Sequence, residues 1–318
     1  MLQNLGDILR AIHKILWKEG DFMTTRRTDL ALEAHALLRA ARGEGRIDGL
    51  SLTERRLHGC AVTEVRVESE GASRALGKPR GAYLTLDLRT LPDDPAARTE
   101  RAALALSEAL RSLIGPPAKT ALVVGLGNRA MTPDLLGPRA AEHIPATRHL
   151  KSEAAFSSLA AVSVLTPGVL GTTGLEAAEQ VRGAVEAVRP DLVVAIDALA
   201  SRRLERVCTT VQLSDAGIVP GSGVGNHRGA LTRETLGVPV LAVGVPTVVD
   251  AATLALDLLD EAGASLPEPD ALRGHECVMV TPRDIDARVE ELSRIVGFGV
   301  GLALQRALSL DELRALID

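Results

Sequence analysis

"ALVVGLGNRAMTPDLLGPR", residues 121–139, decides the fold. It begins with a continuous apolar run at residues 121–126, turns on Gly125 and Gly127, and then carries one acid, Asp134, towards a predicted helix at 137–143. A continuous apolar run followed by a glycine turn is typical of a strand that is covered on both faces. The stretch therefore predicts a strand, a loop that holds a carboxylate, and a helix.

The same alternation continues along the chain. Apolar runs at residues 160–165, 192–196 and 240–245 are separated by helical patterns, which include 174–188 and 248–259. Alternating strands and helices predict a parallel sheet with right-handed crossovers. Further strands are predicted at 60–67, 82–88 and 207–213, and helices at 96–113 and 285–308. We expect an α/β fold with a mostly parallel sheet flanked by helices and a small β/α addition.

Composition and charge limit the classes of partner. The chain has 318 residues, a net charge of −5 and only 2% aromatic residues, so its core must be aliphatic. There is no overall basic field to hold DNA or an anionic membrane, and no segment long and apolar enough to span one. The three cysteines lie far apart without a CxxC motif, which favours a reducing cytoplasm. Residues 1–21 form an amphipathic pattern, with a helix predicted at 2–17, and not a signal peptide.

The common catalytic motifs are absent or incomplete. Gly125-Leu126-Gly127 begins like a dinucleotide fingerprint, but Ala130 replaces the third glycine and Thr132-Pro133 interrupts the helix that should follow. The sequence has no HExxH zinc motif and no GxSxG nucleophile elbow. We therefore predict no cofactor and no metal.

Two acids follow predicted parallel strands. Asp134 comes after the first apolar run, and Asp197 closes "LVVAID". Carboxyl ends of parallel strands gather ligands and catalytic groups, and two close carboxyl groups supply an acid and a base in one site. Either residue could instead cap the helix after it. Capping is the stronger expectation for Asp250, and a turn for Asp215.

Several longer motifs resemble the germination protease family of spore-forming bacteria. The resemblance runs in order from about residue 27 to about residue 304, and its core is similar to that of the hydrogenase maturation proteases. It is carried by the segments "VVGLGN", "TPDLLGP", "TRHL", "PGVLGTTGLE", "PDLVVAIDALASRRLERV", "TTVQLSDAGIVPGSGVGN", "TLGVPVLAVGVPTVVDA" and "VMVTPRDID".

The resemblance implies an endopeptidase of an atypical aspartic type, made as a zymogen. Its implied substrates are the small acid-soluble proteins of the spore, its implied assembly is a homotetramer, and its implied place is the cytoplasm of the forespore or spore core. The proposed catalytic pair of the family corresponds to Asp134 and Asp197. We do not assign which of them is the acid.

The resemblance also implies a self-cleavage site. The family cuts after an acid in a Thr-acid-apolar-Ala-x-Glu context, and "TDLALE", residues 28–33, fits it. The predicted cut lies between Asp29 and Leu30, so residues 1–29 would be an extension and 30–318 a single α/β protease domain. Read without the family, Thr28 or Asp29 is the N-cap of a helix, with Glu33 nearby.

Further residues are predicted around the two acids. Gly125, Gly127 and Asn128 shape the loop that positions Asp134. Backbone N–H groups there or around Gly168 to Gly171 are candidates for holding an oxyanion. Arg202 and Arg203, on a helix predicted after Asp197, could read the acid before the cut, although solvated helix charges explain them as well.

Two other functions stay open at this stage. One is a hydrogenase-maturation-type protease whose acids recognise a metal on the substrate. The other is a non-catalytic module that uses its glycine loops to bind a nucleotide or a peptide.

Overall fold

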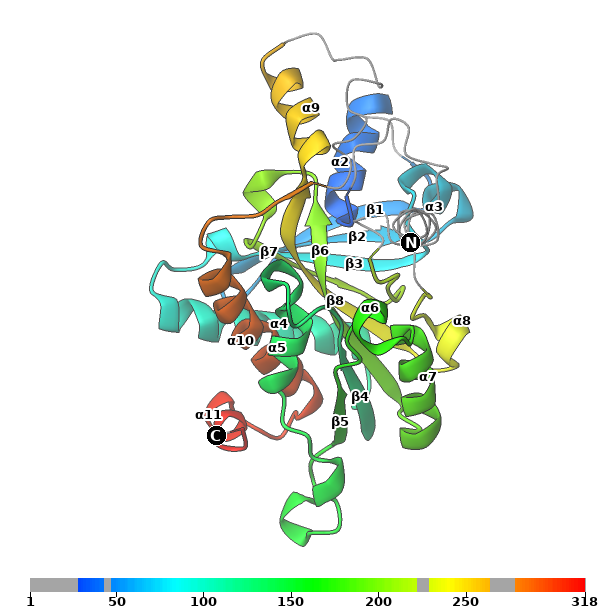
Figure 1. The fold of residues 1–318 in the computed structure, drawn as a ribbon, viewed down its shortest axis with the longest axis vertical. Helices are drawn as coiled ribbons and strands as arrows, with labels where there is room; N and C mark the ends of the chain where they lie inside the picture. The colour runs from blue at the N-terminus through cyan, green and yellow to red at the C-terminus, as the bar shows by residue number, and fades with distance from the viewer. Residues whose placement is uncertain (1–27, 43–46, 222–228, 264–277, 318) are drawn as a thin grey trace, which may run out of the picture.

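The computed structural model describes residues 28–42, 47–221, 229–263 and 278–317. The helix expected at 2–17 lies outside these ranges. One sheet organises the chain, in the order β1-β2-β3-β7-β8-β6-β4-β5, with β9 paired to β8 (Figure 1). Its strands are β1 (Leu50–Leu57), β2 (Cys60–Val67), β3 (Gly81–Asp87), β4 (Thr120–Gly125), β5 (Ala161–Leu165), β6 (Leu192–Ser201), β7 (Thr210–Ser214), β8 (Val240–Asp250) and β9 (Met279–Val280).

The sheet has a parallel half and an antiparallel half. β5, β4, β6 and β8 are parallel, whereas β7, β3, β2 and β1 continue from β8 in antiparallel pairs. The predicted α/β class, with parallel strands between helices, is confirmed. The predicted β/α addition is the antiparallel half of the same sheet, and it includes β1, which was not predicted because its side chains are nearly all exposed and show no apolar face.

Helices cover both faces of the sheet (Figure 1). One face packs on α4 (Pro95–Ile114), α5 (Leu136–Glu142) and α10 (Ile285–Leu304) in a single large apolar core. The other face is covered in two separate places. Over the parallel half lie α6 (Leu170–Thr173), α7 (Ala177–Val188) and α8 (Arg233–Leu236), and over the antiparallel half lie α2 (Ala31–Arg42) and α3 (Glu70–Leu76). The remaining helices are α9 (Ala251–Glu261) and α11 (Leu310–Ala315).

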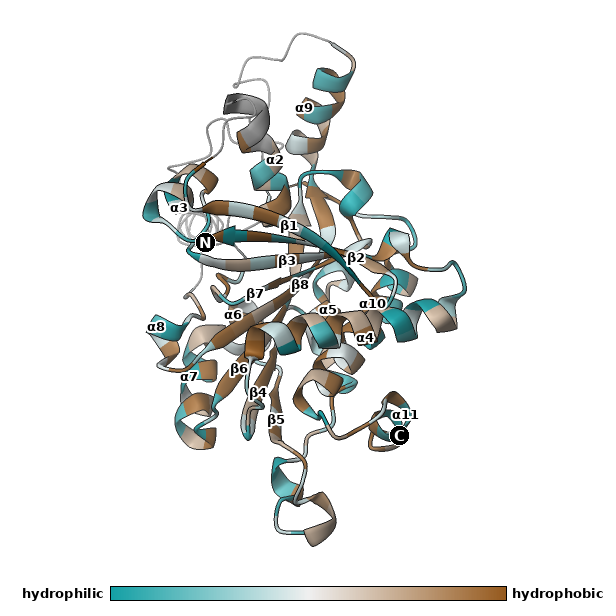
Figure 2. Cartoon of the chain, turned by 180° about the vertical axis from the view of Figure 1, so that it is seen from behind, coloured by the Kyte–Doolittle hydropathy of each residue, from teal (hydrophilic) through white to brown (hydrophobic). Residues whose placement is uncertain are grey.

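Polar side chains occupy the sheet between these two clusters. The parallel strands themselves are mostly apolar, brown in Figure 2. One row of residues crosses four strands on the face away from α4, α5 and α10. The pairing registers align in it Thr85 of β3, Gln212 of β7, Gly244 of β8 and Asp197 of β6. Thr85, Gln212 and Asp197 are all buried. We call these four residues the polar row.

The ends of several elements differ from the prediction. β6 runs to Ser201 and β8 to Asp250, each five residues beyond its apolar run, because both remain paired with each other. The predicted helix at 285–308 is α10, which ends at Leu304. Its glycines do not interrupt it: Gly297 faces α5 and Gly299 faces α4 so closely that a side chain would collide there. In the ranges described, each helix is either too short or too polar to cross a bilayer.

Candidate active site

The loop after β4 holds Asp134 against its own glycine turn. Asp134 ends a short 3-10 turn, η2 (Thr132–Asp134), and its Oδ2 accepts a hydrogen bond of 2.8 Å from the N–H of Asn128. Gly127 has φ +126°, and a side chain there would collide with the backbone carbonyl of Asp134. A side chain at Gly125 would likewise collide with the backbone of Gly137 at the start of α5. Asp134 does not cap α5, whose N-cap is Leu135 without a side-chain bond, so the capping interpretation is wrong.

Asp197 lies within β6 and not at its end. Its side chain is 6% exposed, and its Oδ1 accepts a bond from the N–H of Ala198. No helix begins after it, because β6 continues for four more residues, so the capping interpretation of Asp197 is also wrong. Asp250, in contrast, caps α9 as expected, accepting bonds from the backbone and hydroxyl of Thr253.

The structure brings the segments of the two acids to the same end of the sheet. Leu126, at the end of β4, donates its N–H to the carbonyl of Ile196, the residue before Asp197, at 2.8 Å. Gly127, the next residue, contacts Asp134. The turn η2 also contacts β6 directly. Two backbone contacts therefore connect the acid in the loop to the acid in the strand.

Residues 28–33 lie against β6 and against the polar row. Asp29 donates its N–H to the carbonyl of Ala200 at 3.0 Å, and its Oδ2 accepts the N–H of Ala200 at 2.9 Å. Leu30 and Ala31 are fully buried. Ala31 donates its N–H to Oε1 of Gln212 at 2.8 Å. The segment therefore contacts the strand of Asp197 and the polar row at once.

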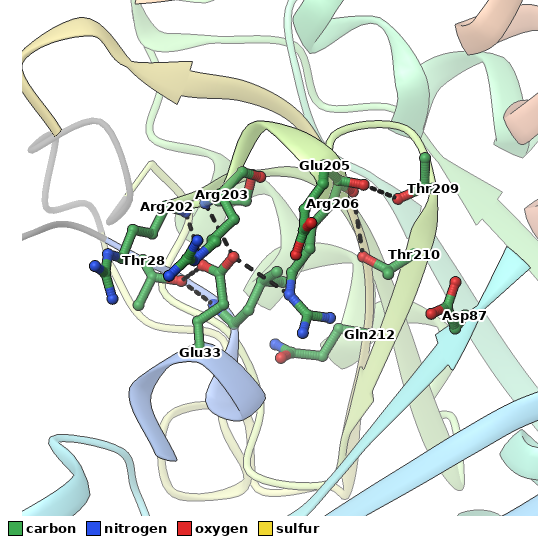
Figure 3. A network of polar contacts seen from close by, with 12 residues as sticks. Thr28, Glu33, Asp87, Arg202, Arg203, Glu205, Arg206, Thr209, Thr210 and Gln212 are labelled. Carbon is green, nitrogen blue, oxygen red and sulfur yellow. Dashed lines mark hydrogen bonds and ion pairs between the residues drawn. The ribbon is translucent and has the colours of Figure 1, made fainter. Parts of the chain in front are cut away.

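The carboxylate of Glu33 has a buried pocket of its own (Figure 3). It is 4% exposed and accepts backbone N–H bonds from Arg202 at 2.7 Å and Arg203 at 3.0 Å. The guanidinium of Arg206 lies 3.5 Å away. Thr28 donates its hydroxyl to the same carboxylate at 2.5 Å, and accepts the N–H of Leu30 at 3.0 Å. Thr28 accepts the N–H of Leu30, one residue before α2 begins, so it closes a turn ahead of the helix and does not form the expected N-cap.

The carbonyl of Asp29 faces two side chains. Lys78 donates to it from Nζ at 2.9 Å, and Gln212 donates from Nε2 at 3.2 Å. Sequence analysis did not find either residue. Gln212 has one sequence signal, a long polar side chain inside the predicted strand at 207–213. Lys78 has none, because it follows a surface helix and reaches the site through the fold.

The structure gives Arg202 a different role from the predicted one. It follows β6 directly, before the short turn η5 (Leu204–Arg206), and not on a helix. Its buried guanidinium binds Asp257 of α9, with 2.7 and 3.0 Å bonds to one oxygen. The acid before the predicted cut, Asp29, is held instead by a backbone N–H of β6. Arg202 meets residues 28–33 through its backbone, at Glu33.

Gly168 and Gly171 follow β5, the edge strand that pairs with β4 on the side away from β6. Gly168 has φ +74°, in the loop before α6, and Gly171 lies within α6. The side chain of Arg129 connects the Asn128 loop to Thr166 near this loop, with a 3.5 Å bond. Among the described residues, no group of three or more His, Cys, Asp or Glu is arranged to hold a metal ion.

Known proteins resemble this chain over most of its length. The family model described as germination protease matches residues 29–262. A germination protease of Caldanaerobacter subterraneus is 41% identical over 92% of this chain and 98% of its own. Those of Clostridium tetani and Bacillus cereus are 40% and 36% identical over 92% and 91% of this chain, and 99% and 96% of their own. Among solved structures, a [NiFe] hydrogenase maturation protease of Thermococcus kodakarensis matches 62% of this chain and 98% of its own, with 19% identity and a TM-score of 0.35.

Proposed function

The chain belongs to the germination protease family, a family of peptidases, and we propose that it is an endopeptidase made as a zymogen that cuts itself between Asp29 and Leu30. Its substrates after that cut are small acid-soluble spore proteins, which it degrades in the spore core during germination. It works as a homotetramer. The family establishes the peptidase class, and the cut, the substrate, the assembly and the mechanism are the proposal.

One observation carries the proposed cut. The bond between Asp29 and Leu30 lies against β6, where Asp29 bonds to Ala200, three residues along the strand from Asp197. Gln212 binds groups on both sides of that bond, the carbonyl of Asp29 and the N–H of Ala31. An ordinary helix start needs only its first N–H groups satisfied. Here the fold also binds the carbonyl, the carboxylate of Asp29 and the carboxylate of Glu33. The segment is bound as a peptide substrate would be, residue by residue.

The two acids activate water in this proposal. One of Asp134 and Asp197 is ionised and takes a proton from water, and the other is protonated and gives its proton to the peptide nitrogen. Gly127 and Asn128 serve by holding the Asp134 carboxylate in place. The proposal assigns these two roles to the pair and not to either residue.

The test follows the mass of the full chain with time at mildly acidic and neutral pH. Wild type is compared with Asp134→Asn, Asp197→Asn and a control, Asp311→Asn, whose carboxylate is on the exposed surface of α11. We expect a fragment that ends at Asp29 in wild type and control, and no such fragment in the two site variants. Cutting that persists in both site variants would rule out the two-aspartate mechanism. The processed wild-type chain is then mixed with a small acid-soluble spore protein, which it should cut after acidic residues.

A further inference from the structure

The carbonyl of Asp29 stands outside the helix that follows it. The first helical bond of this segment joins the N–H of Ala34 to the carbonyl of Leu30, one residue after Asp29. A carbonyl near a buried segment needs a donor. It has two, and both are side chains from distant parts of the chain: Lys78 Nζ at 2.9 Å and Gln212 Nε2 at 3.2 Å.

Gln212 has a fixed orientation towards this carbonyl. Its Oε1 accepts the N–H of Ala31, so its amide N–H₂ points to the Asp29 oxygen. Gln212 and Asp197 lie in the polar row on either side of Gly244, and adjacent strands are about 4.8 Å apart, so their Cα atoms are about 10 Å apart. A carbonyl bound by Gln212 therefore lies over the same part of the sheet as the Asp197 carboxylate.

Lys78 is held equally firmly. The preceding helix α3 ends at Gly77 in the left-handed conformation, and Ser73 donates its hydroxyl to the carbonyl of Lys78 at 2.8 Å. Nζ donates to two carbonyls in succession, those of Thr28 and Asp29. The charged groups that face it are the carboxylates of Asp29 and Glu33. The ammonium group of a half-buried lysine is thus directed at the carbonyls of Thr28 and Asp29.

We infer that Lys78 and Gln212 form the site that holds the carbonyl oxygen of the bond to be cut, and that Lys78 neutralises the oxyanion that forms there. This inference rests on the proposed cut between Asp29 and Leu30. It places the oxyanion site in the antiparallel half of the sheet and the loop before it. The loop around Gly168, which the sequence offered as another candidate for the oxyanion site, follows β5, the edge strand of the parallel half.

Water is the only molecule that reacts with the peptide bond in this scheme. The water oxygen forms a bond to the carbonyl carbon of Asp29 as one acid takes its proton, and the carbonyl electron pair moves onto the oxygen held by Lys78 and Gln212. The bond to the Leu30 nitrogen then breaks, and that nitrogen receives a proton from the other acid. The products are a carboxyl group at Asp29 and an amine at Leu30. Donors placed at such an oxyanion lower the barrier because they need not reorganise during the reaction.

The experiment measures self-cleavage of the full chain in four variants. Lys78→Met keeps the stem and removes the charge, Lys78→Arg keeps the charge, and Gln212→Glu keeps the acceptor for Ala31 while removing the donor. Lys119→Met is a control at an exposed lysine. We expect the rate of cutting to fall by about 10²–10³-fold in Lys78→Met and by at least about tenfold in Gln212→Glu, with no change in the control.

Two further measurements separate catalysis from anchoring. Hydrogen exchange of the N–H groups of Asp29 and Ala31 reports whether the segment stays on the sheet. Protection should persist in Lys78→Met, because those bonds go to Ala200 and Gln212. Burial lowers the pKa of Lys78, so the ammonium is complete at low pH and is lost as pH rises through that lowered pKa. Wild-type cutting should fall over this range, and Lys78→Arg, which stays charged, should not show the fall.

Each outcome decides a definite claim. A Lys78→Met chain that is cut at the wild-type rate, or one that loses both cutting and protection of the segment, would overturn the oxyanion role of Lys78 and leave the endopeptidase intact. A wild-type chain that stays whole at every pH would refute the proposed cut itself, and the oxyanion site with it.

Discussion

Replacing Glu33 by Gln should loosen residues 28–33 from the sheet far more than the removal of one charge from the surface would. The Glu33 carboxylate is 4% exposed and receives two backbone N–H bonds, a hydroxyl bond and the nearby Arg206 guanidinium. Glutamine has nearly the same shape. It offers one acceptor oxygen and presents an N–H₂ group where the second carboxylate oxygen was.

The size of the effect follows from these bonds. A hydrogen bond to a charged group contributes about 1.5–3 kcal/mol, and a neutral one about 0.5–1.5 kcal/mol. In Glu33→Gln one backbone bond changes from charged to neutral, which costs about 1 kcal/mol, and the other N–H faces a second donor, which costs about 1–3 kcal/mol. The free energy that holds the segment should therefore fall by about 2–4 kcal/mol.

Hydrogen exchange of the Asp29 and Ala31 N–H groups measures this free energy directly, since both are bonded to the sheet. The matched control is Glu261→Gln, because Glu261 pairs with Arg203 on the exposed surface, where an ion pair contributes less than about 1 kcal/mol. Exchange at both N–H groups should accelerate by about 30-fold or more in Glu33→Gln and hardly at all in the control. Equal exchange in the two variants would show that the Glu33 pocket does not hold the segment.

Three other changes have expected outcomes. Gly127→Ala should lower the free energy of unfolding by at least about 1–3 kcal/mol in a denaturant titration, because φ +126° strains any side chain and the new methyl group meets the following loop, whereas Gly171→Ala, with open space around it, should have no such cost. Arg202→Met should cost about 3–5 kcal/mol in the same titration, since it leaves a buried carboxylate of α9 without its guanidinium, and Arg203→Met, at an exposed pair, should cost less than about 1 kcal/mol. Burial raises the pKa of Cys208 to about 12, so a disulfide reagent at pH 8 should label this thiol only at the rate of unfolding, which mass spectrometry can follow. Because this pKa lies above that of the unfolded thiol, the stability that the buried neutral thiol contributes is lost as the pH rises towards 12.

The parallel half of the fold could be predicted because its strands are short apolar runs, at residues 121–126, 160–165, 192–196 and 240–245, with helical patterns between them. Burial on both faces of a sheet requires such runs. The ends of those strands could not be predicted equally well. "LVVAID" reads as a strand that stops at its acid, whereas β6 and β8 pair with each other as far as Ser201 and Val249, so that Asp197 lies inside the strand.

The carbonyl site could not be predicted, for a different physical reason. Lys78 and Gln212 lie 134 residues apart, on a loop after a surface helix and on an antiparallel strand, and no local pattern connects them. The register of the sheet places Gln212 opposite Gly244 and so beside the strand of Asp197, whereas Lys78 reaches the same carbonyl from the loop after α3. Periodicity in the sequence reports which face a side chain takes, and it does not report which strands become neighbours.

The contacts of residues 28–33 combine two requirements that a sequence alone keeps apart. The segment leads into a helix, because Gln212 accepts the N–H of Ala31, the first residue of α2, and Thr28 accepts the N–H of Leu30 in the turn before it. The Asp29 carbonyl lies outside that helix and accepts bonds from Lys78 and Gln212. Interpreting the motif as a helix start and interpreting it as a cleavage site are therefore compatible. A cut there would create a charged amine at Leu30, which is fully buried and lies at the positive end of α2, so the bonds that hold the segment before the cut would be opposed after it.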